Sequence, residues 1–289
     1  MTIFNLFKKK PLLGEGSFAK VYKSTYQGRE VAVKQMKFKP HFSKKEQFAK
    51  FEKEAAIMQK LTTSGASQIV SYYDSKRKYH KFTITMEYMP NGSLSNYIRS
   101  TEKYSLDPEK QQQIALDITK GLQHLHSLGF IHRDFKSDNV LLDRDFRAKI
   151  TDFGLTEHRD DIDPIHGAIG TPLYLAPELL LRLVSREPVE KEGYSDKTDI
   201  YALGIIFYEL FTWSDNPYLV LFNNENKTGK ENLEDMIKFV LVKKKRPLIP
   251  EDSCTQEERQ LITQSWAQKP ANRPTADELV EKMTRRSLK

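Results

Sequence analysis

The stretch HRDFKSDN, residues 132–139, crowds two acids, two bases and an amide into eight positions after an apolar segment. A second polar stretch, KITDFGL, occupies residues 149–155. Asp134 could orient an incoming hydroxyl and accept its proton, while Lys136 neutralises a transferring phosphate. Asn139 and Asp152 supply the oxygen ligands that Mg²⁺ prefers. The pattern indicates phosphoryl transfer, and the alternative is a solvated loop that follows a buried helix.

Two glycines near the N-terminus could cover a phosphate. In LGEGSFAKV, residues 13–21, Gly14 and Gly16 let backbone N–H groups approach an anion without side-chain interference. A dinucleotide-binding turn would need a helix directly after the glycines. The continuation KVYKSTYQGREVAVK instead has the pattern of two strands joined at a glycine. We therefore predict a strand–turn–strand flap in preference to a dinucleotide site.

A lysine ends the strand-like sequence VAVK, residues 31–34. Lys34 alternates with its neighbours, so it points to the same side of the strand as Ala32. A lysine beneath a glycine flap could bind a phosphate, and Glu54 on a predicted helix could hold the lysine in place. The alternatives are a strand lysine that reaches water and a glutamate on a solvated helix face beside Lys50 and Lys53.

Strand patterns dominate the first ninety residues, at 20–26, 30–36, 68–74 and 81–89. One helix interrupts them at residues 48–61; its predicted apolar face consists of Phe48, Phe51, Ala55, Met58 and Leu61. After the breaker cluster PNGS, helical spacing prevails at residues 93–100, 109–129, 200–211, 233–244, 256–268 and 276–283. We predict an α+β fold over one domain, residues 1–289. A small β-rich lobe with one main helix (1–89) precedes a larger, mostly helical lobe (90–289).

Five motifs occur in a fixed order along the chain. They are Gly14-x-Gly16, VAVK ending at Lys34, HRD followed by Asn139, DFG at residues 152–154 and APE at residues 176–178. This set is similar to the signature of eukaryotic-type protein kinases, and the resemblance extends from about Leu13 to Met283. It implies the bilobal kinase fold, ATP and Mg²⁺ as cofactors, and a protein hydroxyl as the phosphate acceptor.

The resemblance also implies roles for single residues. The residues that would contact the nucleotide phosphates are Gly14, Gly16, Ser17 and Lys34, and Glu54 would pair with Lys34. The residues that would surround adenine, including the gatekeeper Met86 and the hinge, are Leu13, Val21, Ala32, Met86, Glu87, Met89 and Leu141. The catalytic base, the γ-phosphate ligand and the two magnesium ligands would be Asp134, Lys136, Asn139 and Asp152. The architectural residues would be Asp199, which anchors the catalytic loop, and the ion pair Glu178–Arg273.

Two motifs indicate serine or threonine as the acceptor. Lys136 stands in RDFKSDN, where tyrosine kinases resemble RDLAARN or RDLRAAN. GTPLYLAPE contains Thr171, which would hydrogen-bond near Asp134 and Lys136. DIYALGIIFYELF and RPTADELVEKM, in contrast, look close to tyrosine kinases. The mixture resembles the tyrosine-kinase-like group of serine/threonine kinases, with dual specificity as an alternative.

A pseudokinase scaffold and a small-molecule kinase of similar fold compete with this interpretation. Ala19 replaces the third glycine of the flap, a position that tolerates small residues in kinases. No catalytic position is replaced, which argues against a pseudokinase. Small-molecule kinases usually lack Arg133 and the GTPLYLAPE stretch, which serve a peptide acceptor.

The activation segment, residues 152–178, has an unusual composition. Thr156 is the only hydroxyl residue between Leu155 and Gly170, and the loop carries Asp160, Asp161 and Asp163 instead. In many kinases the arginine before the catalytic aspartate, here Arg133, pairs with a loop phosphate. We hypothesise that one of these aspartates pairs with Arg133 permanently; the alternative is a solvated acidic loop.

Charge and composition bear on the partners and the cellular compartment of the protein. The formal net charge is +7, but the basic residues are scattered and their two tight clusters are not interleaved with aromatics, so no nucleic-acid partner is expected. A single cysteine, Cys254, and the lack of a spanning apolar run predict a cytosolic protein. His124 and His126 lie two apart on different helix faces, so they are poor joint metal ligands.

Overall fold

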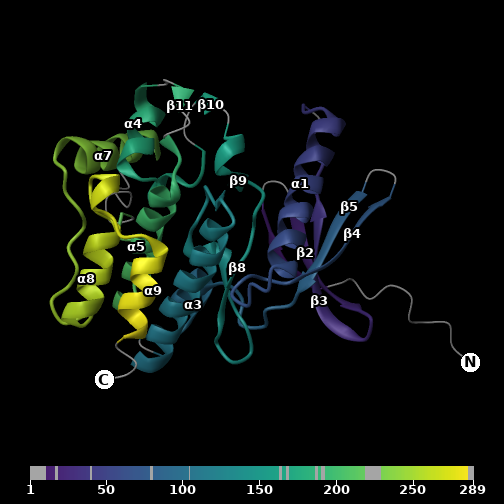
Figure 1. Ribbon diagram of the computed structural model, residues 1–289, viewed down its shortest axis with the longest axis horizontal. Helices are drawn as coiled ribbons and strands as arrows, with labels where there is room; N and C mark the ends of the chain where they lie inside the picture. The colour runs from purple at the N-terminus through teal and green to yellow at the C-terminus, as the bar shows by residue number, and fades with distance from the viewer. Residues whose placement is uncertain are drawn as a thin grey trace, which may run out of the picture.

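The computed structural model describes residues 11–285 except 17–18, 40, 79–80, 104, 163–164, 167–168, 186–187, 190–192 and 219–228. Its two parts lie side by side, with the strands of the N-terminal part on one side and most helices on the other (Figure 1). The predicted α+β class, with a β-rich part followed by a mostly helical part, is confirmed.

The N-terminal part is an antiparallel five-stranded sheet in the order β1-β2-β3-β5-β4. The strands are β1 (Leu12–Glu15), β2 (Ala19–Tyr26), β3 (Arg29–Met36), β4 (Tyr72–Lys78) and β5 (Lys81–Glu87). The turn between β2 and β3 is Gln27-Gly28, with φ of 49° and 76°. Glycine adopts this left-handed conformation without strain, which suits a two-residue hairpin between β2 and β3.

Strand β4 begins four residues later than predicted. Ile69 forms a parallel bridge to Ile150, and the Val70 amide donates to the Ile150 carbonyl at 2.9 Å. These backbone groups are therefore used to join the two parts of the molecule, and β4 pairs with β5 only from Tyr72.

The single long helix of this part, α1 (Lys44–Thr63), packs against the sheet. Its buried side chains include the whole predicted apolar face, with Ile57 and Glu54 in addition. Phe48 and Phe51 contact Phe82 of β5 with ring centroids 6.5 and 5.8 Å apart. Burial of such aromatic surface is the main attraction that holds a helix on a sheet.

The helical part is built on α5 (Asp196–Thr212), in which every side chain from Thr198 to Thr212 is buried. A helix that is apolar on all sides is expected at the centre of a domain. It contacts α2 (Leu94–Ser100), α3 (Pro108–Ser127) and α8 (Gln256–Ser265). Helix α9 (Ala276–Thr284) packs on α3 (Figure 1). The predicted helix at residues 233–244 is divided into α7 (Gly229–Ile237) and a π-helical turn, η5 (Lys238–Val242).

Short elements between α3 and α5 carry the polar motifs. They are β6 (Phe130–Ile131), η1 (Ser137–Asn139), β7 (Val140–Leu142), β8 (Ala148–Ile150), β9 (Glu157–His158), η2 (Arg159–Asp161), β10 (Ile165–His166), η3 (Pro172–Tyr174), α4 (Pro177–Ser185) and β11 (Pro188–Val189). Strands β7 and β8 form a hairpin, and β6 pairs with β9. A 3-10 turn, η6 (Pro270–Asn272), joins α8 to α9.

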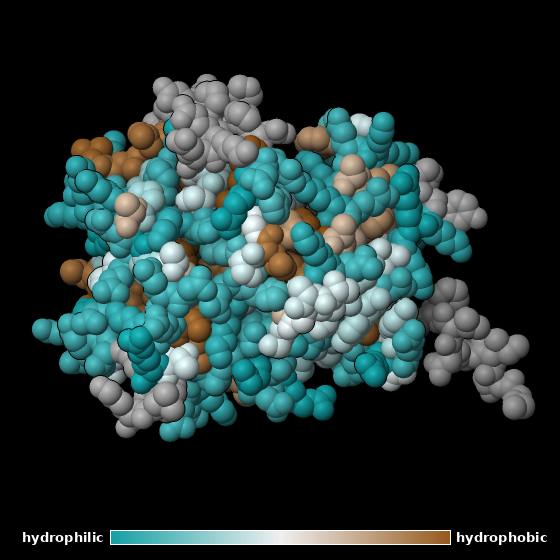
Figure 2. Space-filling model, in the orientation of Figure 1, coloured by the Kyte–Doolittle hydropathy of each residue, from teal (hydrophilic) through white to brown (hydrophobic). Residues whose placement is uncertain are grey.

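The surface in Figure 2 is mainly hydrophilic, and an apolar group gathers over α4 and α7, where Leu181 is exposed. Within the described residues, no helix has both the length and the apolar character that crossing a membrane requires.

Candidate active site

The register of the N-terminal sheet places four of the predicted nucleotide-binding residues on one face. Directly opposed residues of an antiparallel pair project to the same side of a sheet. Val21 of β2 opposes Lys34 of β3, and Ala32 opposes Met86 of β5. Ala32 and Lys34, two apart on β3, share that side. The lysine therefore lies at the end of a row of apolar side chains.

Lys34 lies between two carboxylates that come from distant segments. Its Nζ is 2.6 Å from Glu54 Oε1 on α1 and 2.7 Å from Asp152 Oδ1, and its side chain is only 13% exposed. Burial alone would lower the pKa of Lys34, but the two carboxylates outweigh it and raise this pKa above its ordinary value. The Lys34 side chain therefore stays protonated and positively charged.

The same cation acts on its partners in different ways. Burial raises the pKa of Glu54, and Lys34 offsets part of that rise. Lys34 lowers the pKa of Asp152, whose side chain is 47% exposed. The predicted Lys34–Glu54 pair is present, and the solvated alternative for Glu54, which is 4% exposed, is wrong.

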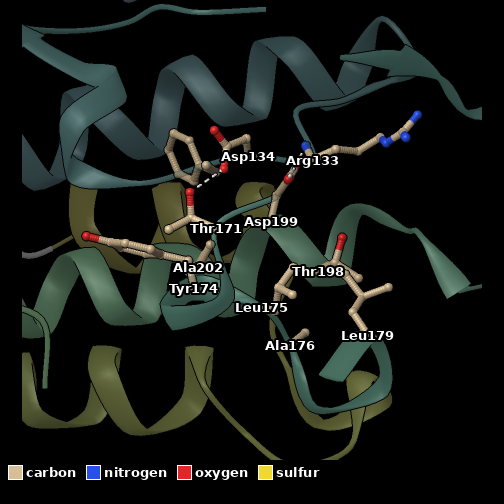
Figure 3. Close-up of a pocket in the computed structure, with 11 residues that line it drawn as sticks. Arg133, Asp134, Thr171, Tyr174, Leu175, Ala176, Leu179, Thr198, Asp199 and Ala202 are labelled. Carbon is tan, nitrogen blue, oxygen red and sulfur yellow. Dashed lines mark hydrogen bonds between the residues drawn. The ribbon is translucent and has the colours of Figure 1, made fainter. Parts of the chain in front are cut away.

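Asp134, Lys136 and Thr171 form a closed triangle of hydrogen bonds. Thr171 Oγ1 donates to Asp134 Oδ1 at 2.7 Å (Figure 3). Lys136 Nζ donates to Asp134 Oδ2 at 2.9 Å and to Thr171 Oγ1 at 2.8 Å. Charge-assisted bonds of this kind fix the carboxylate in one orientation. The contact expected for Thr171 is therefore present, and a cavity of about 20 Å³ lies beside it, lined in part by Asp134 and Thr171.

The loop that carries Asp134 is held by Asp199 of α5. Asp199 Oδ2 accepts from the His132 amide at 2.8 Å and bonds to His126 Nε2 at 2.9 Å, and its Oδ1 accepts from the Arg133 amide at 3.1 Å. Arg133 has a φ of 67°, a strained left-handed conformation for an arginine. The buried carboxylate stabilises that conformation, so the predicted anchoring geometry of Asp199 is present.

Asn139 and Asp152 are the two predicted magnesium ligands, an amide and a carboxylate that lie on either side of the β7–β8 pair in the chain. The Asn139 side-chain nitrogen donates to the Asp134 carbonyl at 2.8 Å, which makes the amide oxygen the end available to a cation. Mg²⁺ is typically bound by one or two protein oxygens, with phosphates and water completing its shell. Among the described residues no cluster of three or more histidine, cysteine or acidic residues could hold a metal alone. The chemistry of an amide oxygen and a carboxylate is that of protein ligands which Mg²⁺ accepts beside phosphates.

The glycine flap has room on its surface. A β-carbon built on Gly14 would meet no described atom within 4 Å, and one on Gly16 would meet only the Ala19 carbonyl at 4.0 Å. Internal packing therefore does not demand glycine there, which is consistent with an open space for a ligand. Leu13 is 43% exposed at the edge of the flap, and Ser17 lies outside the described residues.

The end of β5 is fixed by an ion pair that the sequence did not suggest. Lys149 Nζ contacts both carboxylate oxygens of Glu87, at 2.7 and 2.9 Å, and the Glu87 amide donates to the Ser71 carbonyl at 2.9 Å. Met89 is buried, and Leu141 is half-buried on β7. The predicted hinge residues thus lie where the two parts of the chain join.

Arg273 uses all five of its side-chain N–H donors. Its guanidinium binds both carboxylate oxygens of Glu178 at 2.7 and 2.8 Å. The remaining donors reach the carbonyls of Ala267 at 2.9 Å, Lys197 at 2.8 Å and Gln268 at 3.3 Å. The predicted Glu178–Arg273 pair is present, and it joins the end of the activation segment to the start of α5.

Among the described residues, the carboxylate beside Arg133 is that of Glu157, which our hypothesis of Asp160, Asp161 or Asp163 did not include. Arg133 Nη1 lies 3.7 Å from Glu157 Oε1, and the other Glu157 oxygen pairs with Lys53 of α1. Asp160 lies 3.4 Å from His158 Nδ1, and Asp163 is outside the described residues. Glu157 on β9 is positioned by its strand pairing with Ile131, directly before the catalytic loop, whereas Asp160 follows on the exposed turn η2.

A buried glutamate connects the acceptor side of the site to α5. Tyr174 donates to Glu209 Oε1 at 2.7 Å, and the Tyr174 hydroxyl lies 3.0 Å from Ser137 Oγ in the catalytic loop. Glu209 is 3% exposed, and this burial raises its pKa to about 7. The sequence did not indicate this network, and its only signal was Glu209, the one charged residue of the apolar run 200–211.

Comparison with known proteins agrees with the geometry. The model of the protein kinase domain matches residues 7–283. The serine/threonine/tyrosine-protein kinase HT1 of Arabidopsis thaliana is 32% identical over 92% of this chain and 62% of its own length. In Dictyostelium discoideum, a probable LIM domain-containing serine/threonine-protein kinase is 34% identical over 93% of this chain and 38% of its own length. The dual specificity protein kinase shkB of the same organism is 29% identical over 94% of this chain and 39% of its own length. The chain spans less than two thirds of each of these relatives. With nearly its whole length matched, the chain belongs to the protein kinase domain family.

Proposed function

We propose that this domain transfers the γ-phosphate of ATP to serine or threonine hydroxyls of proteins. The observation that carries the proposal is the orientation of Asp134, whose two oxygens are held by Thr171 at 2.7 Å and by Lys136 at 2.9 Å. A fixed carboxylate next to a lysine can accept a proton while the cation balances the phosphoryl group. The buried pair Lys34–Glu54 supplies the cation for the other phosphates.

Each residue has a distinct part in the proposed reaction. Asp134 orients the acceptor hydroxyl and takes its proton, and Lys136 stabilises negative charge on the transferring group. Lys34, kept charged by its carboxylate partners, positions the α- and β-phosphates. Mg²⁺ held by Asn139 and Asp152 would add charge neutralisation across the phosphates. The apolar side chains that would enclose the adenine are those of Val21, Ala32, Met86 and Leu141.

The choice of serine or threonine rests on Lys136 and Thr171. Together they close the acceptor side of Asp134 with a cationic side chain and a small hydroxyl residue. Dual specificity is the second candidate, because two of the relatives are a serine/threonine/tyrosine kinase and a dual specificity kinase. With a single cysteine in the chain, the proposal places the protein in the cytosol.

The test is transfer of labelled γ-phosphate from Mg-ATP to a generic protein substrate, followed by identification of the labelled amino acid. We expect label on serine or threonine, and a loss of at least about 10³-fold in Asp134→Asn. Asp138→Asn is the matched control, because Asp138 lies in the same loop but accepts from Ser95 at 2.8 Å. An inactive wild type that binds ATP would favour the pseudokinase scaffold, and label on tyrosine would favour dual specificity.

A further inference from the structure

The activation segment keeps its hydroxyl groups occupied. Residues 152–178 contain only three hydroxyl side chains, Thr156, Thr171 and Tyr174. Thr156 is 2% exposed and directs its hydroxyl to the His132 carbonyl at 3.4 Å. Thr171 binds Asp134, and Tyr174 is buried against Glu209. A phosphate on any of them would have to displace a contact of the folded site.

Arg133 nevertheless has a guanidinium that needs an anion. Its side chain is 2% exposed and points away from Asp134 and Thr171 (Figure 3). The guanidinium lies 4.8 Å from the centre of the Tyr194 ring, and burial lowers its pKa. A buried cation without a counter-charge is costly. Glu157, 3.7 Å away, supplies that charge from within the segment.

Glu157 also reaches the N-terminal part of the molecule. Its second oxygen pairs with Lys53, the residue before Glu54 on α1, and Glu54 holds Lys34 at 2.6 Å. In Figure 1, β9 lies next to α1, although Lys53 and Glu157 are 104 positions apart in the chain. One carboxylate thus joins the catalytic loop to the helix that carries the partner of the phosphate-binding lysine.

The backbone around Glu157 is fixed on the side of the helical part. Ile131 pairs with Glu157 and Phe130 with His158 in the β6–β9 ladder. The amide of the next residue, Arg159, donates to the Gly129 carbonyl at 2.8 Å, and the Arg159 side chain donates to the His126 carbonyl at 2.7 Å. Strand pairing therefore holds the backbone of Glu157 in place without phosphorylation of the activation segment.

We infer that Glu157 is a positioning residue that replaces a loop phosphate, so that α1 and the catalytic loop are aligned without phosphorylation of the activation segment. The inference rests on the proposed kinase activity. Glu157 touches no reacting group; it acts through Arg133 on the catalytic loop and through Lys53 on α1.

The experiment compares phosphatase-treated wild type with Glu157→Gln, Glu157→Asp, Lys53→Ala and the control Lys50→Ala, which removes an exposed lysine from the same helix. We expect treated wild type to keep its activity and Glu157→Gln to lose about tenfold in kcat with less change in the KM for ATP. Glu157→Asp should recover part of the loss in kcat. The kcat of Lys53→Ala should lie between those of wild type and Glu157→Gln. Lys50→Ala should match the wild type.

Hydrogen exchange of the same unphosphorylated proteins gives a readout that needs no activity. We expect faster exchange in α1 and in residues 155–162 of Glu157→Gln, and no change in Lys50→Ala. Wild-type exchange and wild-type kcat in a folded Glu157→Gln protein would overturn the inference, as would loss of activity on phosphatase treatment. If the wild type is inactive but Glu157→Gln still speeds exchange in α1, the proposed function is refuted and the positioning role of Glu157 is kept. If the wild type is inactive and exchange in α1 is unchanged, the proposed function and the positioning role are both refuted.

Discussion

Thr171 Oγ1 donates a hydrogen bond to Asp134 Oδ1 over 2.7 Å, across 37 positions of sequence. The same hydroxyl accepts from Lys136 Nζ at 2.8 Å. The activation segment therefore sets the orientation of the predicted catalytic base directly, through one side chain.

Replacing Thr171 by valine keeps the shape of the side chain and removes both bonds. We expect kcat/KM for a protein substrate to fall about 10- to 100-fold, because the carboxylate loses one of its two orienting donors. The KM for ATP should change little, since the nucleotide is held elsewhere. Steady-state kinetics with each substrate varied in turn provides the measurement. Thr171→Ser retains the hydroxyl and should stay within a few-fold of wild type; equal losses in both variants would contradict this role.

The second prediction concerns Glu54, which is 4% exposed and lies 2.6 Å from Lys34. Glu54→Gln removes the carboxylate, so Lys34 keeps only Asp152 as a charged partner. We expect kcat to fall about 100-fold through misplacement of the lysine. Glu52→Gln is the matched control, because Glu52 lies on the same helix, is 50% exposed and pairs with Arg77. An unchanged rate in Glu54→Gln would show that Lys34 does not depend on this pair.

The third prediction is a pH dependence of stability that comes from Glu209. Its pKa is about 7 in the folded protein against an ordinary value of 4.5, so the folded state binds the proton more tightly than the unfolded chain does. This contribution is fully present below pH 4.5 and is lost as the pH rises through 7. Glu209→Gln stays neutral and should gain stability relative to wild type from about pH 5 to about pH 8, by up to about 3 kcal/mol.

Chemical denaturation at several pH values measures this difference. Glu281→Gln serves as the control, because its carboxylate is 61% exposed and should leave the profile unchanged. Parallel pH profiles for wild type and Glu209→Gln would contradict the raised pKa.

The sequence predicted the parts of the site that depend on local patterns. Alternation along β3 was enough to place Lys34 and Ala32 on one side, and the helical period was enough to bury Phe48, Phe51 and Met58. The motif around Asp134 and Asn139 is compact, so the bond between these two residues forms within one loop. The order of five such motifs then indicated the fold.

The remaining contacts join residues whose sequence surroundings give no sign of one another. Glu157 and Lys53 are 104 positions apart, and each looks like an ordinary surface charge in its own segment. His126 reaches Asp199 across 73 positions. Both contacts exist only because β9 and α5 are placed by tertiary packing, so the acidic composition of the loop did not single out Glu157.

The engagement of Glu178 by Arg273 has a mechanical consequence. The far end of the activation segment is fastened to the carbonyls that begin α5 and follow α8, so it travels with the helical part. Its near end is held on the helical part by the β6–β9 ladder, and only the Glu157 side chain reaches across to Lys53 of α1, which packs on the sheet. A rotation of the sheet against the helical part would therefore separate Glu157 from Lys53, while both ends of the segment stay with the helical part.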